Sequence, residues 1–187
     1  MLLRMNYPLP LAILDTETTG LDPRGDRIIE IGIIRVENGS ETRRFNALIN
    51  PECALPAIIT EITGITDNML VSAQKFESIA EEVSDILDGA IFVAHNAPFD
   101  LGFVRSELSR AGKNFDGKSL CTVRLSRNLY PEHRRHDLAS IIERYGFNAG
   151  TRHRAEDDAN VVWQFLRHSA QHAPKPRFDA ALRASML

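Results

Sequence analysis

A short apolar strand that ends in two acids constrains the fold of this chain more than any other stretch. Leu11 to Leu14 is a continuous apolar run, and Asp15 and Glu17 follow it. Such a run predicts a buried strand, and in an extended chain residues two apart point the same way. The two carboxylates would then converge at one edge of the core, where a hard divalent cation such as Mg²⁺ or Mn²⁺ is a natural partner. An acidic turn after a structural strand would explain the same pair.

The composition is that of one globular domain. The chain has 187 residues, of which 43% are hydrophobic and 25% charged, so it can build a substantial core and is unlike a disordered chain. No apolar run approaches the roughly 20 residues that span a bilayer, and Met1–Pro10 lacks the apolar region of a signal peptide. We therefore expect a cytoplasmic protein with no membrane association, in which Cys53 and Cys121 are reduced thiols.

The charge of the chain limits how it could bind nucleic acid. A formal net charge of −3 is not that of a protein that binds duplex nucleic acid by bulk electrostatics. A nucleic-acid enzyme remains compatible with it, because metal-binding carboxylates are themselves acidic. One segment is locally basic, with Arg124, Arg127, Arg134, Arg135, Arg152 and Arg154. A solvated arginine-rich surface would have the same composition.

The first part of the chain predicts three strands with tight connections. The Pro and Gly cluster Leu21–Asp26 is a turn, Ile28–Val36 is β-branched and apolar, and Thr42–Ile49 has the pattern of a returning strand. Asn38-Gly39 between the last two is a strong hairpin signal. These patterns predict an antiparallel meander whose first strand carries the two acids.

Helix and strand patterns alternate in the remainder of the chain. Asn50–Asn68 predicts a long irregular connection with at most a short helical turn. Beyond His172 the chain has two prolines and little periodicity, so we expect it to fray or to serve as an attachment segment. The other expected elements are a helix with apolar residues from Phe76 to Leu87 that ends at Gly89, a strand over Ile91–Ala94, a helix over Pro98–Ala111, a strand over Ser119–Val123, and helices up to Tyr130, over Leu138–Tyr145 and over Ala155–Ser169. Together they predict an α/β domain with a mixed sheet.

Further polar residues lie where they could join the first pair of acids. Asp158 shares the core-facing stripe of the last long helix, where an acid is costly unless it is paired or bound to a metal. His153 precedes that helix and could approach the same site from another direction. Asp100 falls in the first turn of the helix after a buried strand, and strand ends are where α/β sheets build their sites. Compensation of the helix dipole would also explain both acids, and a lone histidine is usually structural.

Three segments together resemble the motifs of the DEDDh family of 3'-to-5' exonucleases. The segments are Asp15–Leu21 (DTETTGL), His95–Asp100 (HNAPFD) and His153–Ala159 (HRAEDDA). Their order, separation and local sequence agree with the family over nearly the whole chain, and the proofreading epsilon subunit of bacterial replicative DNA polymerase is among the members that it resembles. The resemblance implies a ribonuclease H-like fold, with a central five-stranded mixed sheet flanked by helices.

The resemblance also implies a role for each acid and for one histidine. Asp15, Glu17 and Asp158 would hold one divalent ion, and Asp15 would bridge to a second. Asp100 would complete the acidic set, directly or through water. In such two-metal sites the ions flank the scissile phosphate, where one activates the attacking water and the other stabilises the leaving oxygen. His153 would be the general base that takes a proton from that water.

Six residues match positions where relatives contact the 3'-terminal nucleotide or the strand, namely Thr18, Gly20, Leu21, Ile62, Asn96 and Phe99. Gly20 would let the backbone come close to the nucleotide, and Ile62 would be an apolar contact in the second wall of the pocket. Asn96 and Phe99 could instead only shape the motif. Many epsilon-like members have His where this chain has Thr63, which leaves the preference for DNA or RNA open.

The expected function is therefore a metal-dependent 3'-to-5' exonuclease of the proofreading or repair type. It would act on single-stranded or frayed DNA ends and release nucleoside 5'-monophosphates, with Mg²⁺ or Mn²⁺ and a polymerase or repair protein as partner. Trimming of RNA ends is the alternative within the same chemistry, and a nucleic-acid-binding or polymerase-associated module without activity is the alternative outside it. The exonuclease domain would span residues 1–172, followed by a C-terminal tail over residues 173–187.

Overall fold

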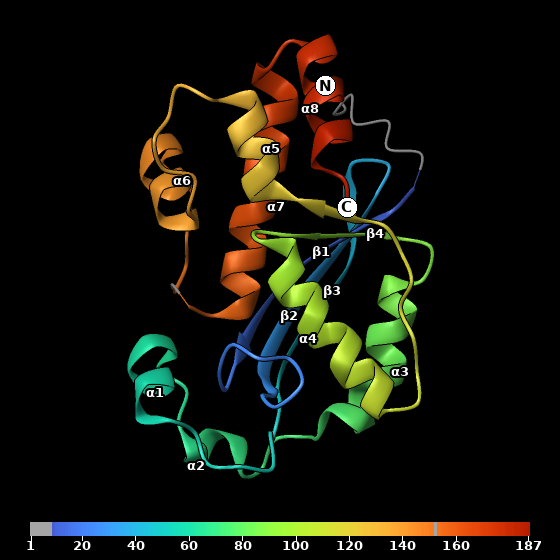
Figure 1. Ribbon diagram of the computed structural model, residues 1–187, viewed down its shortest axis with the longest axis vertical. Coiled ribbons are helices and arrows are strands. Elements are labelled where there is room, and N and C mark those ends of the chain that lie inside the picture. The colour runs from blue at the N-terminus through green and yellow to red at the C-terminus, as the bar shows by residue number, and fades with distance from the viewer. Residues whose placement is uncertain (1–8, 152) are drawn as a thin grey trace.

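A mixed sheet forms the centre of the molecule (Figure 1). The computed structural model describes residues 9–151 and 153–187, and these residues form a five-stranded sheet in the order β3-β2-β1-β4-β5. Strand β2 is antiparallel to both of its neighbours, whereas β4 is parallel to β1 and β5. The strands are β1 Leu11–Thr18, β2 Ile28–Glu37, β3 Ser40–Leu48, β4 Ile91–Ala94 and β5 Ser119–Cys121. The predicted meander and the predicted α/β class are both confirmed.

Helices cover both faces of this sheet. On β1, Leu14 packs in the core that α3 and α4 complete, whereas Ile13 packs in the core that α7 and α8 complete. Asp15 and Glu17 continue the alternation of Ile13 and leave the strand on the α7 side. The helices are α1 Ala57–Thr63, α2 Asp67–Leu70, α3 Phe76–Leu87, α4 Ala97–Arg110, α5 Thr122–Leu129, α6 Leu138–Tyr145, α7 Ala155–His172 and α8 Lys175–Ser185.

Local sequence signals account for several of these boundaries. Asn38 and Gly39 have φ values of 53° and 77°, as the predicted tight hairpin turn requires. Asn96 caps α4 and has Pro98 just after it, inside the first turn, where proline costs no hydrogen bond. The side chain of Asp137 accepts a hydrogen bond from Ser140 N at 2.9 Å and so caps α6.

The connection between β3 and α3 is more ordered than predicted. It contains α1 and α2 rather than one short helical turn, and α1 ends at Gly64, whose φ of 71° is left-handed. Ile65 and Leu70 bury their side chains against Ile29 in a small core of their own. These few apolar anchors hold both helices against the sheet, although neither helix has enough turns to show a clear period in the sequence.

The chain beyond His172 does not fray within the described residues, so the expectation of fraying is wrong, while its use as an attachment segment stays a prediction. It forms α8, which buries Phe178 and Ala181 against the rest of the molecule. The last residue then pairs with β5, where Leu187 N donates to Ser119 O at 2.8 Å. Apolar burial and backbone pairing together outweigh the weak helical pattern of this segment.

Two expectations fall outside the described residues. The first concerns residues 1–8, which make up most of the segment Met1–Pro10 and the start of the expected domain. The second concerns Arg152 of the basic segment. Among the helices that the structure describes, none has both the length and the apolar character that crossing a bilayer requires.

Candidate active site

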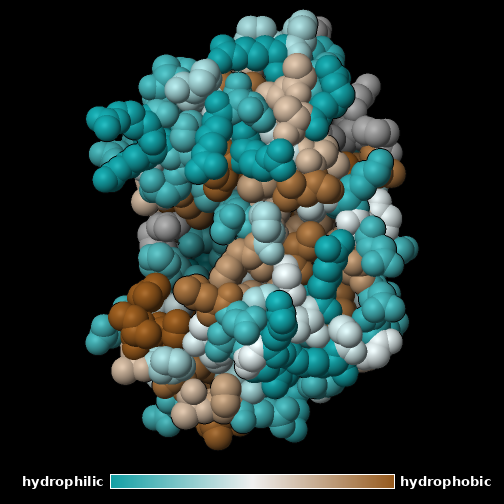
Figure 2. All heavy atoms as spheres, viewed as in Figure 1, coloured by the Kyte–Doolittle hydropathy of each residue, from teal (hydrophilic) through white to brown (hydrophobic). Residues whose placement is uncertain are grey.

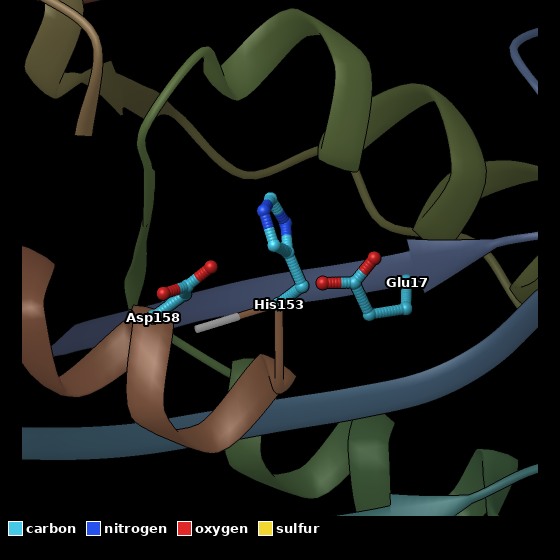
Figure 3. Close-up of side chains that lie close together, drawn as sticks. All are labelled: Glu17, His153 and Asp158. Atoms are coloured by element: carbon cyan, nitrogen blue, oxygen red, sulfur yellow. The ribbon is translucent and has the colours of Figure 1, made fainter. Parts of the chain in front are cut away.

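Three side chains from distant parts of the sequence meet beside the end of β1. Glu17, His153 and Asp158 each offer a ligand atom, and these atoms lie within 4.8 Å of one another. Figure 3 shows the imidazole between the two carboxylates, with Glu17 on β1, Asp158 on α7 and His153 in the segment before α7. Asp158 is 4% exposed, whereas His153 is exposed to solvent. Two carboxylate oxygens and an imidazole nitrogen at this spacing fit a divalent cation.

The strand geometry predicted for the first two acids is confirmed. β1 continues through Thr18, and its register places Asp15 opposite Gly32 and Glu17 opposite Glu30 on β2. Both acids are half-buried, while the residues that alternate with them are buried. Asp15 therefore lies on the same face as Glu17, although it is not one of the three residues whose ligand atoms meet within 4.8 Å among the residues described.

Asp100 approaches β1 from α4, beyond the point where β4 stops pairing with β1. It is 3% exposed, and its Oδ1 accepts hydrogen bonds from Thr16 N at 3.1 Å and Thr16 Oγ1 at 2.9 Å. Burial raises the pKa of Asp100 to about 7, and the hydrogen bonds from Thr16 oppose that rise. Because Thr16 lies between the two acids of β1, Asp100 fixes the part of the strand that carries them. Compensation of a helix dipole is thus not its only role.

An ion pair between the buried carboxylate of Glu30 and Arg154, which was not predicted from the sequence, holds the segment before α7. Glu30, on β2, is 0% exposed and accepts hydrogen bonds from Arg154 Nη2 at 2.7 Å and from Ala155 N at 3.0 Å. A signal for Glu30 was present in the sequence, because an acid inside the apolar run Ile28–Ile34 must have a partner if the strand is buried. The identity of that partner could not be deduced, since it lies 124 residues away along the chain.

Gly32 allows α7 to start directly on the sheet. A Cβ atom at this position would lie 2.4 Å from Glu156 N and 2.5 Å from Ala155 C. Backbone atoms cannot move away as a flexible side chain can, so a glycine is required for this close approach. The first turn of α7, which carries Asp158, therefore rests on β2 beside the acids of β1.

The predicted substrate contacts differ in their surroundings. Leu21 is 83% exposed and Ile62 is 48% exposed, so both offer apolar surface to solvent. Thr18 Oγ1 donates to Gly20 O at 2.7 Å, which shapes the turn after β1. A Cβ atom at Gly20 would lie 2.3 Å from Asp26 Oδ2. Gly20 is therefore explained by packing inside the loop, whether or not a nucleotide approaches it.

Asn96 and Phe99 have clear structural roles at the start of α4. Asn96 adopts a left-handed conformation with φ 82°, and the ring of Phe99 packs against Phe103 with centroids 5.0 Å apart. Thr63, where many epsilon-like proteins have histidine, is turned into its own helix, since its Oγ1 donates to Ile59 O at 2.8 Å. These residues shape the motifs, and strand contact by Asn96 and Phe99 stays a prediction.

A hollow lies between two chemically different surfaces. Figure 2 shows it in the middle of the viewed face, between a hydrophobic patch at the lower left, where Figure 1 places α1, and a mainly hydrophilic upper part. The exposed apolar side chains of α1 are Ile58 and Ile62. Beside the start of α4 a cavity of about 410 Å³ has Asn96, Arg124 and Arg127 in its lining. Such a setting suits a strand with stacked bases and charged phosphates.

Comparison with known proteins decides the family. Residues 12–166 match the exonuclease family RNase_T. The chain belongs to this exonuclease family. The match includes all five of the residues with expected catalytic roles, and it confirms at the level of the family the predicted kinship with DEDD-type 3'-to-5' exonucleases.

Two relatives of this chain are named as a 3'-5' exonuclease and as a polymerase subunit. The 3'-5' exonuclease DinG of Bacillus subtilis is 46% identical over 152 residues, which cover 80% of this chain and 16% of that protein. The DNA polymerase III subunit epsilon of Treponema pallidum is 39% identical over 163 residues, or 85% of this chain and 76% of that protein. The chain thus spans most of the epsilon subunit but only a small part of DinG.

Solved structures confirm the fold of this exonuclease family member. Escherichia coli exonuclease I in complex with a dT13 oligonucleotide superposes with a TM-score of 0.80 at 16% identity, over 91% of this chain and 43% of that one. Exonuclease X in complex with 5' overhanging duplex DNA superposes with a TM-score of 0.68 at 22% identity, over 92% of this chain and 99% of that one. At these identities the likeness shows the predicted fold alone.

Proposed function

We propose that this chain is a metal-dependent 3'-to-5' exonuclease that hydrolyses phosphodiester bonds at the 3' end of single-stranded or frayed DNA. The products would be nucleoside 5'-monophosphates. The observation that carries the proposal is the convergence of Glu17, His153 and Asp158 within 4.8 Å. It brings oxygen ligands for a hard cation and a proton acceptor to one place. Membership of the exonuclease family supports the same reaction.

Each member of the site has a proposed role. Asp15, Glu17 and Asp158 would hold one divalent ion, Mg²⁺ or Mn²⁺, Asp15 would also ligate a second, and Asp100 would complete the acidic set directly or through water. Bound ions of this kind stabilise charge at the phosphate and lower the pKa of water. His153 accepts the proton of the attacking water through an imidazole nitrogen. Its nitrogen lies in the same 4.8 Å cluster as the carboxylates, so direct metal ligation is the competing role for this side chain.

The 3'-terminal nucleotide is proposed to lie between the loop after β1 and α1. Leu21 and Ile62 support this placement, because both are apolar and exposed, as side chains that stack on a base must be. The remaining proposed contacts are Thr18, Gly20, Asn96 and Phe99. Arg124 and Arg127 line the cavity beside α4 and would attract phosphates further along the strand.

DNA is the preferred substrate in this proposal. Support comes from the oligonucleotides named in the structures of exonuclease I and exonuclease X and from the similarity to a DNA polymerase subunit. Trimming of RNA ends by the same chemistry is the alternative. The similarity to the epsilon subunit also supports a polymerase or repair protein as partner. Residues 1–172 remain the proposed exonuclease domain, and a cytoplasmic location is part of the proposal.

Parallel digestion of matched oligonucleotides tests the substrate. A single-stranded DNA and an RNA of the same sequence, each labelled at the 5' end, are incubated with the protein and Mg²⁺ or Mn²⁺, and the initial rates of shortening are compared. We expect faster shortening of DNA and none with Asp15→Ala. Faster trimming of RNA would overturn the preference for DNA. No metal-dependent shortening of either strand, with wild type and Asp15→Ala alike, would support a module without activity.

A further inference from the structure

We infer that the ion pair between the buried Glu30 carboxylate and Arg154 positions His153 for its role in the site, so that Glu30 and Arg154 are positioning residues of the reaction. This inference rests on the proposed function, because it assigns a task to the base of that reaction. It concerns residues on β2 and before α7 that belong to neither the acidic set nor the proposed substrate contacts.

His153 lies outside every described helix and strand. It precedes α7, its side chain is exposed, and its backbone is left-handed with φ 59°, which is uncommon for a residue other than glycine. Yet its imidazole lies between Glu17 and Asp158 (Figure 3). Some neighbouring contact must therefore fix the backbone at this point, and the residue that follows it supplies one.

Arg154 is fixed to β2 by a planar pair of charged hydrogen bonds. Its Nη2 donates to Glu30 Oε1 at 2.7 Å, and its Nε lies 3.1 Å from both Glu30 oxygens. Glu30 Oε2 also accepts from Ala155 N at 3.0 Å. One buried carboxylate thus restrains two consecutive residues after His153. Forked arginine–carboxylate pairs define orientation as well as distance, which a lysine cannot do.

The same pair connects the segment before α7 to the acids of β1. Glu30 lies opposite Glu17 in the antiparallel ladder, so the two side chains share a face of the sheet. Both carboxylates raise the pKa of the Arg154 guanidinium. Glu30 does so chiefly through its hydrogen bonds, and Glu17 does so through its charge. In addition, Arg154 O accepts from Asp158 N at 3.0 Å in the first turn of α7. Arg154 therefore follows His153 directly in the chain, accepts a hydrogen bond from Asp158 N, and is bound to the strand that pairs with the strand of Glu17.

The test separates positioning from general stabilisation. Arg154→Lys keeps the charge and removes the fork, and the double variant Glu30→Gln/Arg154→Gln replaces the ion pair by neutral groups without leaving a buried charge unpaired. Arg44→Gln is the matched control, because it breaks the Arg44–Glu156 pair at 3.2 Å, which is exposed and also joins the sheet to α7. For each protein kcat and KM are measured on 5'-labelled single-stranded DNA, with Mn²⁺ affinity measured by calorimetry without DNA.

We expect both Arg154 variants to lower kcat by about 10²-fold, the usual cost of misplacing a catalytic group by an ångström, with KM and Mn²⁺ affinity within about threefold of wild type. Arg44→Gln should match wild type. The deciding comparison uses His153→Ala, because Arg154→Lys should cost little more once His153 is absent. A full additional loss in the His153→Ala background, or wild-type kcat for Arg154→Lys, would overturn the inference. Inactive wild-type protein would instead contradict the proposed function itself.

Discussion

At Asp100, burial and hydrogen bonding act on the pKa in opposite directions, and burial dominates. The pKa is raised to about 7 from an ordinary value of 3.8. In the metal-free protein, the folded state therefore keeps a proton that the unfolded state has released between these two pH values. The contribution of Asp100 to the free energy of unfolding must then fall as pH rises from about 4 to 7, since at this residue the unfolded state binds fewer protons there.

The variant Asp100→Asn tests this sign. Asparagine keeps an acceptor for the two hydrogen bonds from Thr16 but cannot ionise, so the variant should gain stability relative to wild type as pH rises from 4.5 to 7.5. The gain is at most about 4 kcal/mol across the range, from about 1.4 kcal/mol for each pKa unit. Denaturant unfolding in excess chelator measures it, with Asp116→Asn, a change at an exposed acid, as the control. A difference that is independent of pH would contradict the raised pKa.

Single residues of the site show how much could be predicted from the sequence. The face of Asp158 and the common direction of Asp15 and Glu17 followed from helical and strand periodicity, and both are found in the structure. Glu30 and Arg154 were missed because their partnership depends on a tertiary contact between β2 and the segment before α7. Periodicity describes the face of one element, and it carries no information on which element lies opposite.

At the scale of elements, the contact between β2 and α7 sets the position of the site. The first turn of α7 touches β2 where Gly32 has no side chain. Elements with a full apolar stripe, such as α3 and α4, were predicted closely. α1 and α8 were not, because α1 exposes Ile58 and Ile62 and α8 has one proline at its N-cap and another in its first turn. Their order comes from tertiary burial rather than from local propensity.

Replacing Gly32 by alanine should displace α7. The added Cβ would meet backbone atoms of Ala155 and Glu156 at 2.4 to 2.5 Å, and overpacking of this kind costs about 1–3 kcal/mol. We also expect weaker Mn²⁺ binding, because Asp158 moves with the helix. Thermal unfolding and calorimetry measure the two effects. The control is Gly102→Ala in α4, whose Cβ would lie 3.3 Å from a side-chain atom of Pro23. Equal stability and Mn²⁺ affinity for both variants would show that α7 does not depend on the glycine.

At the scale of the whole molecule, the fold brings together residues from both ends of the chain. Glu17 lies on the first described strand and Asp158 on the penultimate described helix, so most of the fold separates them in the sequence (Figure 1). Periodicity and strand ends predicted the sheet and allowed this meeting as one alternative, and the resemblance to a family favoured it over the structural alternatives. The hydrophobic patch where α1 lies and the mainly hydrophilic upper part then give the hollow two sides with different chemistry (Figure 2).

The most direct test of the central claim, that these residues form a metal-dependent site acting from the 3' end, is an end-label comparison. One single-stranded DNA is labelled at the 5' end in one sample and at the 3' end in another, and each is incubated with Mn²⁺. Wild type should give a ladder that shortens stepwise from the 5'-labelled strand and labelled mononucleotide at once from the other.

Asp158→Asn should give neither and should bind Mn²⁺ weakly, while His153→Ala should lose about 10²- to 10⁴-fold in rate and retain Mn²⁺ binding. Internal fragments as first products, or full activity of Asp158→Asn, would contradict the account.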